Sequence, residues 1–347
     1  MKNYNSRLRY LLMILIVGFV LTGCGAQSTD SPQVPAVEET SSEETTAQVT
    51  ATEETTAPKQ EPALKVYVSI YPVYYLAQRI GGERLDLTLI IPPGTDAHDF
   101  EPKAKLVGEM TKADVIFYNG LGLEHWTESL FGQLPKSVTV IETSVGIETH
   151  TIDEVLKGDS HQHEHNHNHG AEGLDPHIWL DPTKAIQQAA HVLEALKAAD
   201  SEGANVYTEN FEALKADLEE LDAKFQADLS AFKRREIVVG HAAFGYLVER
   251  YNLKQIAISG ISPLEEPSAA ALGELTHVVK DNKVTTIFYE TLASPKFSEV
   301  LAAETGTKTA VLNPLEGLTQ EEFDAGEDYI SIMMKNLEAI KASLKDE

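Results

Sequence analysis

The sequence LKVYVSI at residues 64–70 is the first of eight short runs that are rich in apolar and β-branched side chains. Turn residues bound each run, and a stretch with helical spacing separates it from the next. Such runs, alternating with helices, are typical of parallel sheets that are buried on both faces. The first set is LKVYVSI (64–70), DLTLII (86–91), DVIFYN (114–119) and VTVIE (138–142), and the second is EIVV (236–239), KQIAIS (254–259), TTIFY (285–289) and TAVL (309–312).

Four runs in each set predict an α/β protein with two similar lobes, each built on a roughly four-stranded parallel sheet flanked by helices. A long helical pattern at residues 204–234 lies between the sets and contains no proline or internal glycine. At 1.5 Å per residue it spans about 45 Å, enough to run along both lobes. We therefore expect an N-terminal lobe at residues 63–203, a linking helix at 204–235 and a C-terminal lobe at 236–347.

The first residues predict export from the cytoplasm. A basic start is followed by an apolar run at residues 11–21, which is too short for an ordinary spanning helix, so residues 1–23 are interpreted as a signal peptide. The run ends in LTGC (21–24), which resembles the bacterial lipobox, and this predicts lipidation of Cys24. Residues 25–62 are rich in Thr, Glu, Ala, Ser and Pro and lack aromatic residues, so 24–62 is expected to be a lipidated cysteine followed by a disordered acidic tether.

Charge and cysteine content restrict the partners. The chain carries 54 acidic and 28 basic residues, a net charge of −26, which repels nucleic acid and anionic lipid but attracts cations. Cys24 is the only cysteine. With that cysteine lipidated, any metal ligand must be a nitrogen or oxygen donor.

Four metal-binding side chains follow predicted strands. His98 and His177 belong to the first lobe, and His241 and Glu316 belong to the second. Because ligands of open parallel sheets bind beyond the carboxyl ends of the strands, we expect these side chains to converge on one ion between the lobes. Three imidazoles and one carboxylate suit tetrahedral Zn²⁺, whereas Mn²⁺ favours more oxygen ligands. Four protein ligands leave no open position for an activated water, so we expect a carrier and not an enzyme.

Seven motifs together resemble the metal-specific solute-binding lipoproteins of bacterial ABC importers, and within them the zinc-uptake branch. The resemblance runs from about residue 64 to the C-terminus. The motifs are SIYPVYYLAQRIGG (69–82), PPGTDAHDFEP (92–102), DVIFYNGLGLEHW (114–126), DPHIWLDP (175–182), VGHAAFGYL (239–247), ISPLEEPS (261–268) and NPLEGL (313–318).

This resemblance implies that His98, His177 and His241 are zinc ligands. Members differ in the fourth ligand; Glu316 is preferred here, and Glu290, after the seventh predicted strand, is the competitor. Asp175 or Asp181 is a candidate acceptor for an imidazole N–H. The resemblance also implies that the protein delivers Zn²⁺ to an ABC permease, which in turn works with its ATPase. We expect a monomer that is anchored to the cell membrane through the lipid on Cys24.

A second group of histidines lies in the polar segment 158–173, where we expect a mobile loop with weak auxiliary metal sites. Its alternating histidines are His161, His163, His165, His167 and His169. HEHNH at 163–167 formally matches the metalloprotease motif HExxH, but that motif works on a helix, and this stretch has no apolar face. We reject the protease interpretation.

Two alternatives to zinc uptake remain at this point. One keeps the importer but changes the ion to Mn²⁺ or Fe²⁺. The other is an adhesin lipoprotein in which the metal only stiffens the fold.

Overall fold

The first four predicted runs form one parallel sheet with the strand order β2-β1-β3-β4. Strand β1 pairs with a strand on each side, and its Val66 lies opposite Leu87 of β2 and Val115 of β3. The valines at 66, 68 and 115 are fully buried, as expected for a sheet covered on both faces. The strands are β1 (Leu64–Val68), β2 (Leu85–Leu89), β3 (Val115–Tyr118) and β4 (Thr139–Glu142).

The second four runs form a separate parallel sheet with the corresponding order, β6-β5-β7-β8. The predicted two-lobe α/β fold is therefore confirmed, with strand ends that lie within two residues of the predicted ends. β8 lies at the sheet edge, which explains why Val311 is partly exposed. The strands are β5 (Glu236–Val239), β6 (Lys254–Ala257), β7 (Thr286–Tyr289) and β8 (Lys308–Val311).

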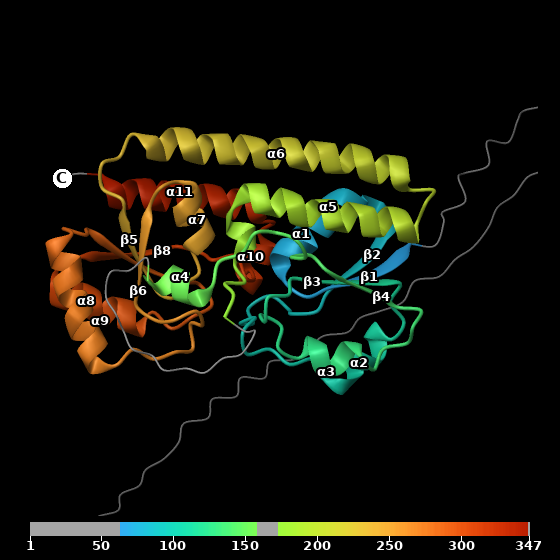
Figure 1. The fold of residues 1–347 in the computed structure, drawn as a ribbon, viewed down its shortest axis with the longest axis horizontal. Helices are drawn as coiled ribbons and strands as arrows, with labels where there is room; N and C mark the ends of the chain where they lie inside the picture. Colours follow the sequence, from blue (N-terminus) through green and yellow to red (C-terminus); the bar gives the residue numbers. More distant parts are fainter. Residues whose placement is uncertain (1–62, 158–172, 346–347) are drawn as a thin grey trace, which may run out of the picture. The chain divides into compact units, whose positions relative to one another are not determined.

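Helices surround the two sheets (Figure 1). Those that precede residue 204 in the chain are α1 (Tyr71–Gly81), η1 (Gly82–Arg84), α2 (Ala104–Met110), α3 (Thr127–Phe131), α4 (Ile152–Lys157), η2 (Ile178–Leu180) and α5 (Pro182–Ala199). Those that follow residue 235 are α7 (Gly245–Arg250), α8 (Ala269–Asp281), α9 (Lys296–Thr305), α10 (Gln320–Asp324) and α11 (Tyr329–Leu344).

The long helix α6 (Ala204–Ser230) extends along both lobes, as Figure 1 shows. It packs against α1 and α5 of the first lobe and against α11 of the second. Its apolar stripe is buried and belongs to a core that also contains residues of both sheets. The helix ends four residues earlier than the sequence pattern suggests. The buried residues of the stripe are Tyr207, Leu214, Leu218, Leu221, Phe225 and Leu229.

Ion pairs attach α6 to both lobes. Asp217 lies 2.6 Å from Arg79 of α1, and Asp222 lies 2.6 Å from Arg250 of α7. Since both carboxylates belong to one continuous helix, these contacts hold the two lobes to a common support.

The computed structural model describes residues 63–157 and 173–345. The predicted signal peptide, Cys24, the tether and the five histidines at 161–169 lie outside these residues. Across the two described ranges, no helix combines the length and apolar character that crossing a membrane requires. The described residues belong to one compact unit, and the predicted lobe boundaries at 203 and 235 stay a prediction.

Candidate metal centre

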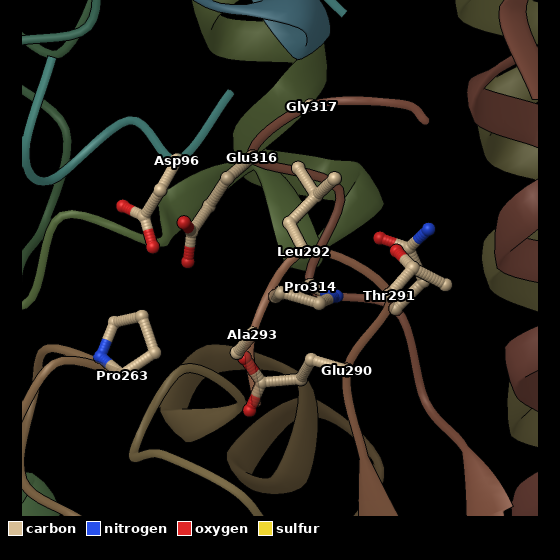
Figure 2. A pocket seen from close by; sticks show the side chains of 10 residues that line it. Asp96, Pro263, Glu290, Thr291, Leu292, Ala293, Pro314, Glu316 and Gly317 are labelled. Carbon is tan, nitrogen blue, oxygen red and sulfur yellow. The ribbon is translucent and has the colours of Figure 1, made fainter. Parts of the chain in front are cut away.

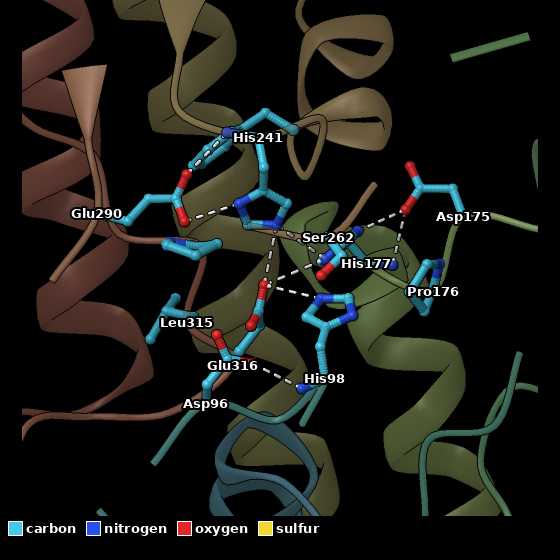
Figure 3. A network of polar contacts seen from close by, with 12 residues as sticks. Asp96, His98, Asp175, Pro176, His177, His241, Ser262, Glu290, Leu315 and Glu316 are labelled. Atoms are coloured by element: carbon cyan, nitrogen blue, oxygen red, sulfur yellow. Dashed lines mark hydrogen bonds and ion pairs between the residues drawn. The ribbon is translucent and has the colours of Figure 1, made fainter. Parts of the chain in front are cut away.

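The four side chains belong to loops at the carboxyl ends of the strands in the two sheets. His98 lies in the loop after β2, and His177 lies just before η2. His241 comes two residues after β5, and Glu316 comes five residues after β8. Figure 3 shows the four side chains pointing toward one another.

The four side chains form one cluster. One nitrogen from each histidine and one carboxylate oxygen of Glu316 all lie within 4.8 Å of one another. Oε1 of Glu316 lies 3.1 Å from Nε2 of His241, 3.2 Å from Nε2 of His177 and 3.5 Å from Nε2 of His98. Ligand atoms about 2.0–2.1 Å from a tetrahedral Zn²⁺ are separated by about 3.3 Å. The three distances to the Glu316 oxygen therefore fit a small four-coordinate cation.

The cluster is largely buried. His177 and His241 are fully buried, Glu316 is nearly so, and the His98 side chain is 11% exposed. Among the described residues, Nε2 of His98 is buried without a hydrogen-bond partner. Since a buried polar atom without a partner costs free energy, this nitrogen favours a ligand at the centre.

Two further carboxylates orient two of the imidazoles. Oδ1 of Asp175 accepts hydrogen bonds from the backbone N of His177 at 3.0 Å and from its Nδ1 at 2.7 Å. Glu290 accepts the equivalent hydrogen bonds from His241. Its Oε1 lies 3.0 Å from the backbone N of His241, and its Oε2 lies 2.7 Å from Nδ1 of His241. With Nδ1 as the donor, each Nε2 presents its lone pair to the centre. Asp181, the other candidate acceptor, instead caps α5.

Glu290 therefore contacts His241 from behind and is absent from the four-atom cluster. Its position after a strand predicts only a competing ligand and does not reveal its place beside Nδ1. The available signal was strand order, since β5 and β7 pair as neighbours. Gly240 makes this approach possible, because a Cβ at Gly240 would lie 2.5 Å from Oε1 of Glu290.

The carboxylates make the centre favourable for positive charge. Burial alone lowers the pKa of His177, but Asp175 and Glu316 outweigh burial and raise that pKa. Burial likewise lowers the pKa of His241, and Glu290 and Glu316 raise it well above its ordinary value. For Glu316, burial raises the pKa, but His98 and the other two imidazoles hold it well below the usual range. The same electrostatics stabilise a divalent cation at this point.

A tight turn presents Glu316. Leu315 has a φ of 60°, in the left-handed region that leucine seldom adopts. Its backbone N donates to Oδ1 of Asn313 at 2.8 Å, and Asn313 is bonded through its own backbone to Asn336 of α11. Nε1 of Trp179 donates to the Pro314 carbonyl at 2.8 Å and so ties this turn to the His177 segment.

A small pocket beside the cluster is lined by Asp96, Glu290 and Glu316, among other residues (Figure 2). Its volume of ≈ 10 Å³ is about what one water molecule needs, so the pocket is too small for an organic ligand. Oδ1 of Asp96 accepts a hydrogen bond from the backbone N of His98 at 2.8 Å.

The remaining described histidines lie outside the four-atom cluster. Nδ1 of His191 lies 2.8 Å from the Thr143 carbonyl, as expected for a structural histidine. His125 and His277 are exposed. His150 stacks on Tyr246 and contacts Glu249.

The chain also has relatives among known proteins. The chain is 39% identical over 288 residues to the zinc-binding lipoprotein AdcA of Streptococcus pneumoniae strain R6, a match that covers 82% of this chain and 56% of the relative. The chain thus spans little more than half of that relative's length. It is 37% identical over 282 residues to the high-affinity zinc uptake system protein ZnuA of Bacillus subtilis, covering 81% and 88% of the two chains.

A solved structure agrees with the fold. The Zn(II)-bound ZnuA-like domain of Streptococcus pneumoniae AdcA matches with a TM-score of 0.69 and 38% identity, covering 82% of this chain and 100% of that domain. The family described as ZnuA, zinc-uptake complex component A, periplasmic, matches residues 66–343. This match spans both sheets and all four clustered side chains, and the chain belongs to that family.

Proposed function

We propose that this protein captures Zn²⁺ at His98, His177, His241 and Glu316 and delivers it to an ABC permease for uptake. The observation that carries the proposal is the spacing of three Nε2 atoms around one carboxylate oxygen, between 3.1 and 3.5 Å. Imidazole and carboxylate ligands at tetrahedral spacing suit Zn²⁺ better than Mn²⁺.

Carriage is favoured over catalysis by the same geometry. Four protein ligands complete a tetrahedral shell and leave no position for an activated water. The relatives support this proposal, since their names describe zinc binding and zinc uptake.

The remaining parts of the proposal concern attachment and partners. Cys24 carries the lipid that holds the protein at the outer face of the cell membrane, residues 24–62 form the tether, and the protein works as a monomer. The permease receives the ion, and its ATPase drives transport. The histidines at 161–169 form weak auxiliary sites.

The direct test of the metal site is titration calorimetry of metal-stripped protein with Zn²⁺ and, separately, Mn²⁺. We expect one tight zinc site, weaker manganese binding, and loss of the tight site in His241→Ala. The exposed His277 of α8 provides the matched control, since His277→Ala removes an imidazole remote from the cluster. Tighter binding of Mn²⁺ than Zn²⁺ would favour the manganese alternative.

Uptake is tested in cells. Removal of the gene is expected to slow growth under zinc limitation, with rescue by added Zn²⁺. Normal growth of such cells, together with lost attachment to host matrix, would favour the adhesin alternative instead.

A further inference from the structure

One short segment after β5 contacts the carboxylates that orient two different imidazoles, those of His241 and His177. It begins with Gly240 and His241 and continues into the start of α7 with Gly245 and Tyr246. Gly240 leaves room for Glu290, the carboxylate that orients His241. Gly245 does the same for the other carboxylate, because a Cβ at Gly245 would lie 2.7 Å from Oδ2 of Asp175.

Tyr246 holds the backbone of Asp175. Its hydroxyl donates to the Asp175 carbonyl at 2.8 Å and accepts a hydrogen bond from the backbone N of His150 at 3.1 Å. The backbone N of Asp175 in turn donates to the His150 carbonyl at 2.9 Å. The hydroxyl thus joins α7 of the second lobe to the two chain segments that lead to His177.

The Tyr246 ring is itself fixed. It is fully buried and stacks on the His150 ring, with the centroids 4.6 Å apart and an interplanar angle of 29°. Nζ of Lys184 lies 5.2 Å from its centroid. The hydroxyl therefore has little freedom to move, and neither does the carbonyl that it holds.

We propose that Gly245 and Tyr246 are positioning residues that fix Asp175 and, through it, the Nε2 atom of His177 that faces the cation. The inference rests on the proposed zinc site. It follows from the chain of contacts, since Oδ1 of Asp175 orients both the backbone and the ring of His177. Partners that orient a metal ligand typically change metal affinity 10–100-fold when they are altered.

Tyr246→Phe tests the proposal because it removes the hydroxyl and keeps the ring. The matched control is Tyr207→Phe, since Tyr207 is also fully buried and its hydroxyl donates to Asp200 at 2.6 Å, on α6 away from the cluster. In chelator competition, we expect Tyr246→Phe to bind Zn²⁺ about 10-fold more weakly and Tyr207→Phe to stay within about twofold of the wild type.

The visible spectrum of bound Co²⁺ supplies a readout that packing alone does not move. Tyr246→Phe should shift the ligand-field bands, and Tyr207→Phe should not. As a second variant, Gly245→Ala should weaken zinc binding, whereas Gly108→Ala, where an added Cβ meets nothing within 4 Å, should not.

A double-mutant cycle tests the route through Asp175. If Tyr246 acts through the Asp175 side chain, then Asp175→Ala combined with Tyr246→Phe loses no more affinity than Asp175→Ala alone, whereas independent effects multiply. Multiplied losses would overturn this route. Unchanged affinity and Co²⁺ spectrum in Tyr246→Phe, beside a tight wild-type site, would overturn this inference alone. A wild type without a tight site would overturn the proposed function as well.

Discussion

Glu290 accepts two hydrogen bonds from one residue, His241, whose backbone N and Nδ1 lie 3.0 and 2.7 Å from its two carboxylate oxygens. Asp175 makes the equivalent pair of contacts with His177. Two imidazoles are thus held in one orientation before a cation arrives. This arrangement lowers the ordering cost of binding, because the ligands need little rearrangement.

Glu290→Gln is expected to weaken zinc binding about 10–100-fold without changing the number of tight sites. The Gln side chain keeps the shape of Glu290 but lacks the negative charge that favours a cation at Nε2 of His241. Chelator competition measures the affinity. Glu142→Gln is the control, because the Glu142 carboxylate accepts hydrogen bonds from Tyr118 and Ser144 instead. Equal affinities for the two variants would contradict the orienting role of Glu290.

Glu316→Gln should weaken zinc binding by more than about 100-fold, beyond the range that is usual for residues behind the ligands. This substitution removes the negative charge of the carboxylate whose oxygen lies within 3.5 Å of all three Nε2 atoms. Measured beside Glu290→Gln in the same assay, this variant identifies the fourth ligand. A larger loss in Glu290→Gln than in Glu316→Gln would assign that role to Glu290.

Asp222→Asn should lower the free energy of unfolding at pH 7 by about 1–2 kcal/mol, because hydrogen bonds to charged groups contribute at that scale. Asp222 accepts hydrogen bonds from Arg250 at 2.6 and 2.9 Å and from Tyr251 at 3.1 Å. Urea unfolding of metal-stripped protein measures the effect. Glu220→Gln, at an exposed position of the same helix, is expected to change stability little.

The Asp222 contribution also has a defined pH dependence. Hydrogen bonding to Arg250 lowers the pKa of Asp222 in the folded protein. A lowered folded-state pKa stabilises the protein above the unfolded value of about 3.9, and this stabilisation is lost as the pH falls through the folded-state pKa. The difference between wild type and Asp222→Asn should therefore shrink as the pH falls below about 4. A difference that is constant from pH 7 to pH 3 would contradict this assignment.

Deletion of residues 159–170 should leave one tight zinc site and remove binding beyond one equivalent. All four clustered side chains, and the carboxylates behind them, lie outside the deleted segment. The chain on either side is joined by the pairing of Thr151 with Leu174 and by a hydrogen bond of 2.6 Å from the Ile152 N to the Gly173 carbonyl. Calorimetry gives the stoichiometry. Loss of the tight site on deletion would mean that the site lies in the His-rich segment.

Much of this architecture is encoded locally. The apolar runs at residues 64–70 and 236–239 specify buried strands because side-chain pattern and β-propensity act over a few residues. The 3.6-residue periodicity from Tyr207 to Leu229 specifies the linking helix in the same way. Parallel topology then brings residues after the strands to one edge of each sheet, so His98 and His241 were identifiable as candidates from their sequence positions.

The assignment of each carboxylate depended on contacts between distant parts of the chain. Glu290 and Glu316 both follow strands, and the sequence does not separate a residue behind an imidazole from one in front of it. The difference arises from the pairing of β5 with β7 and from the left-handed turn at Leu315, which Asn336 supports from α11. Local pattern determines which elements form, but hydrogen bonds span about 3 Å. Partners at that distance are selected only when separate elements pack together.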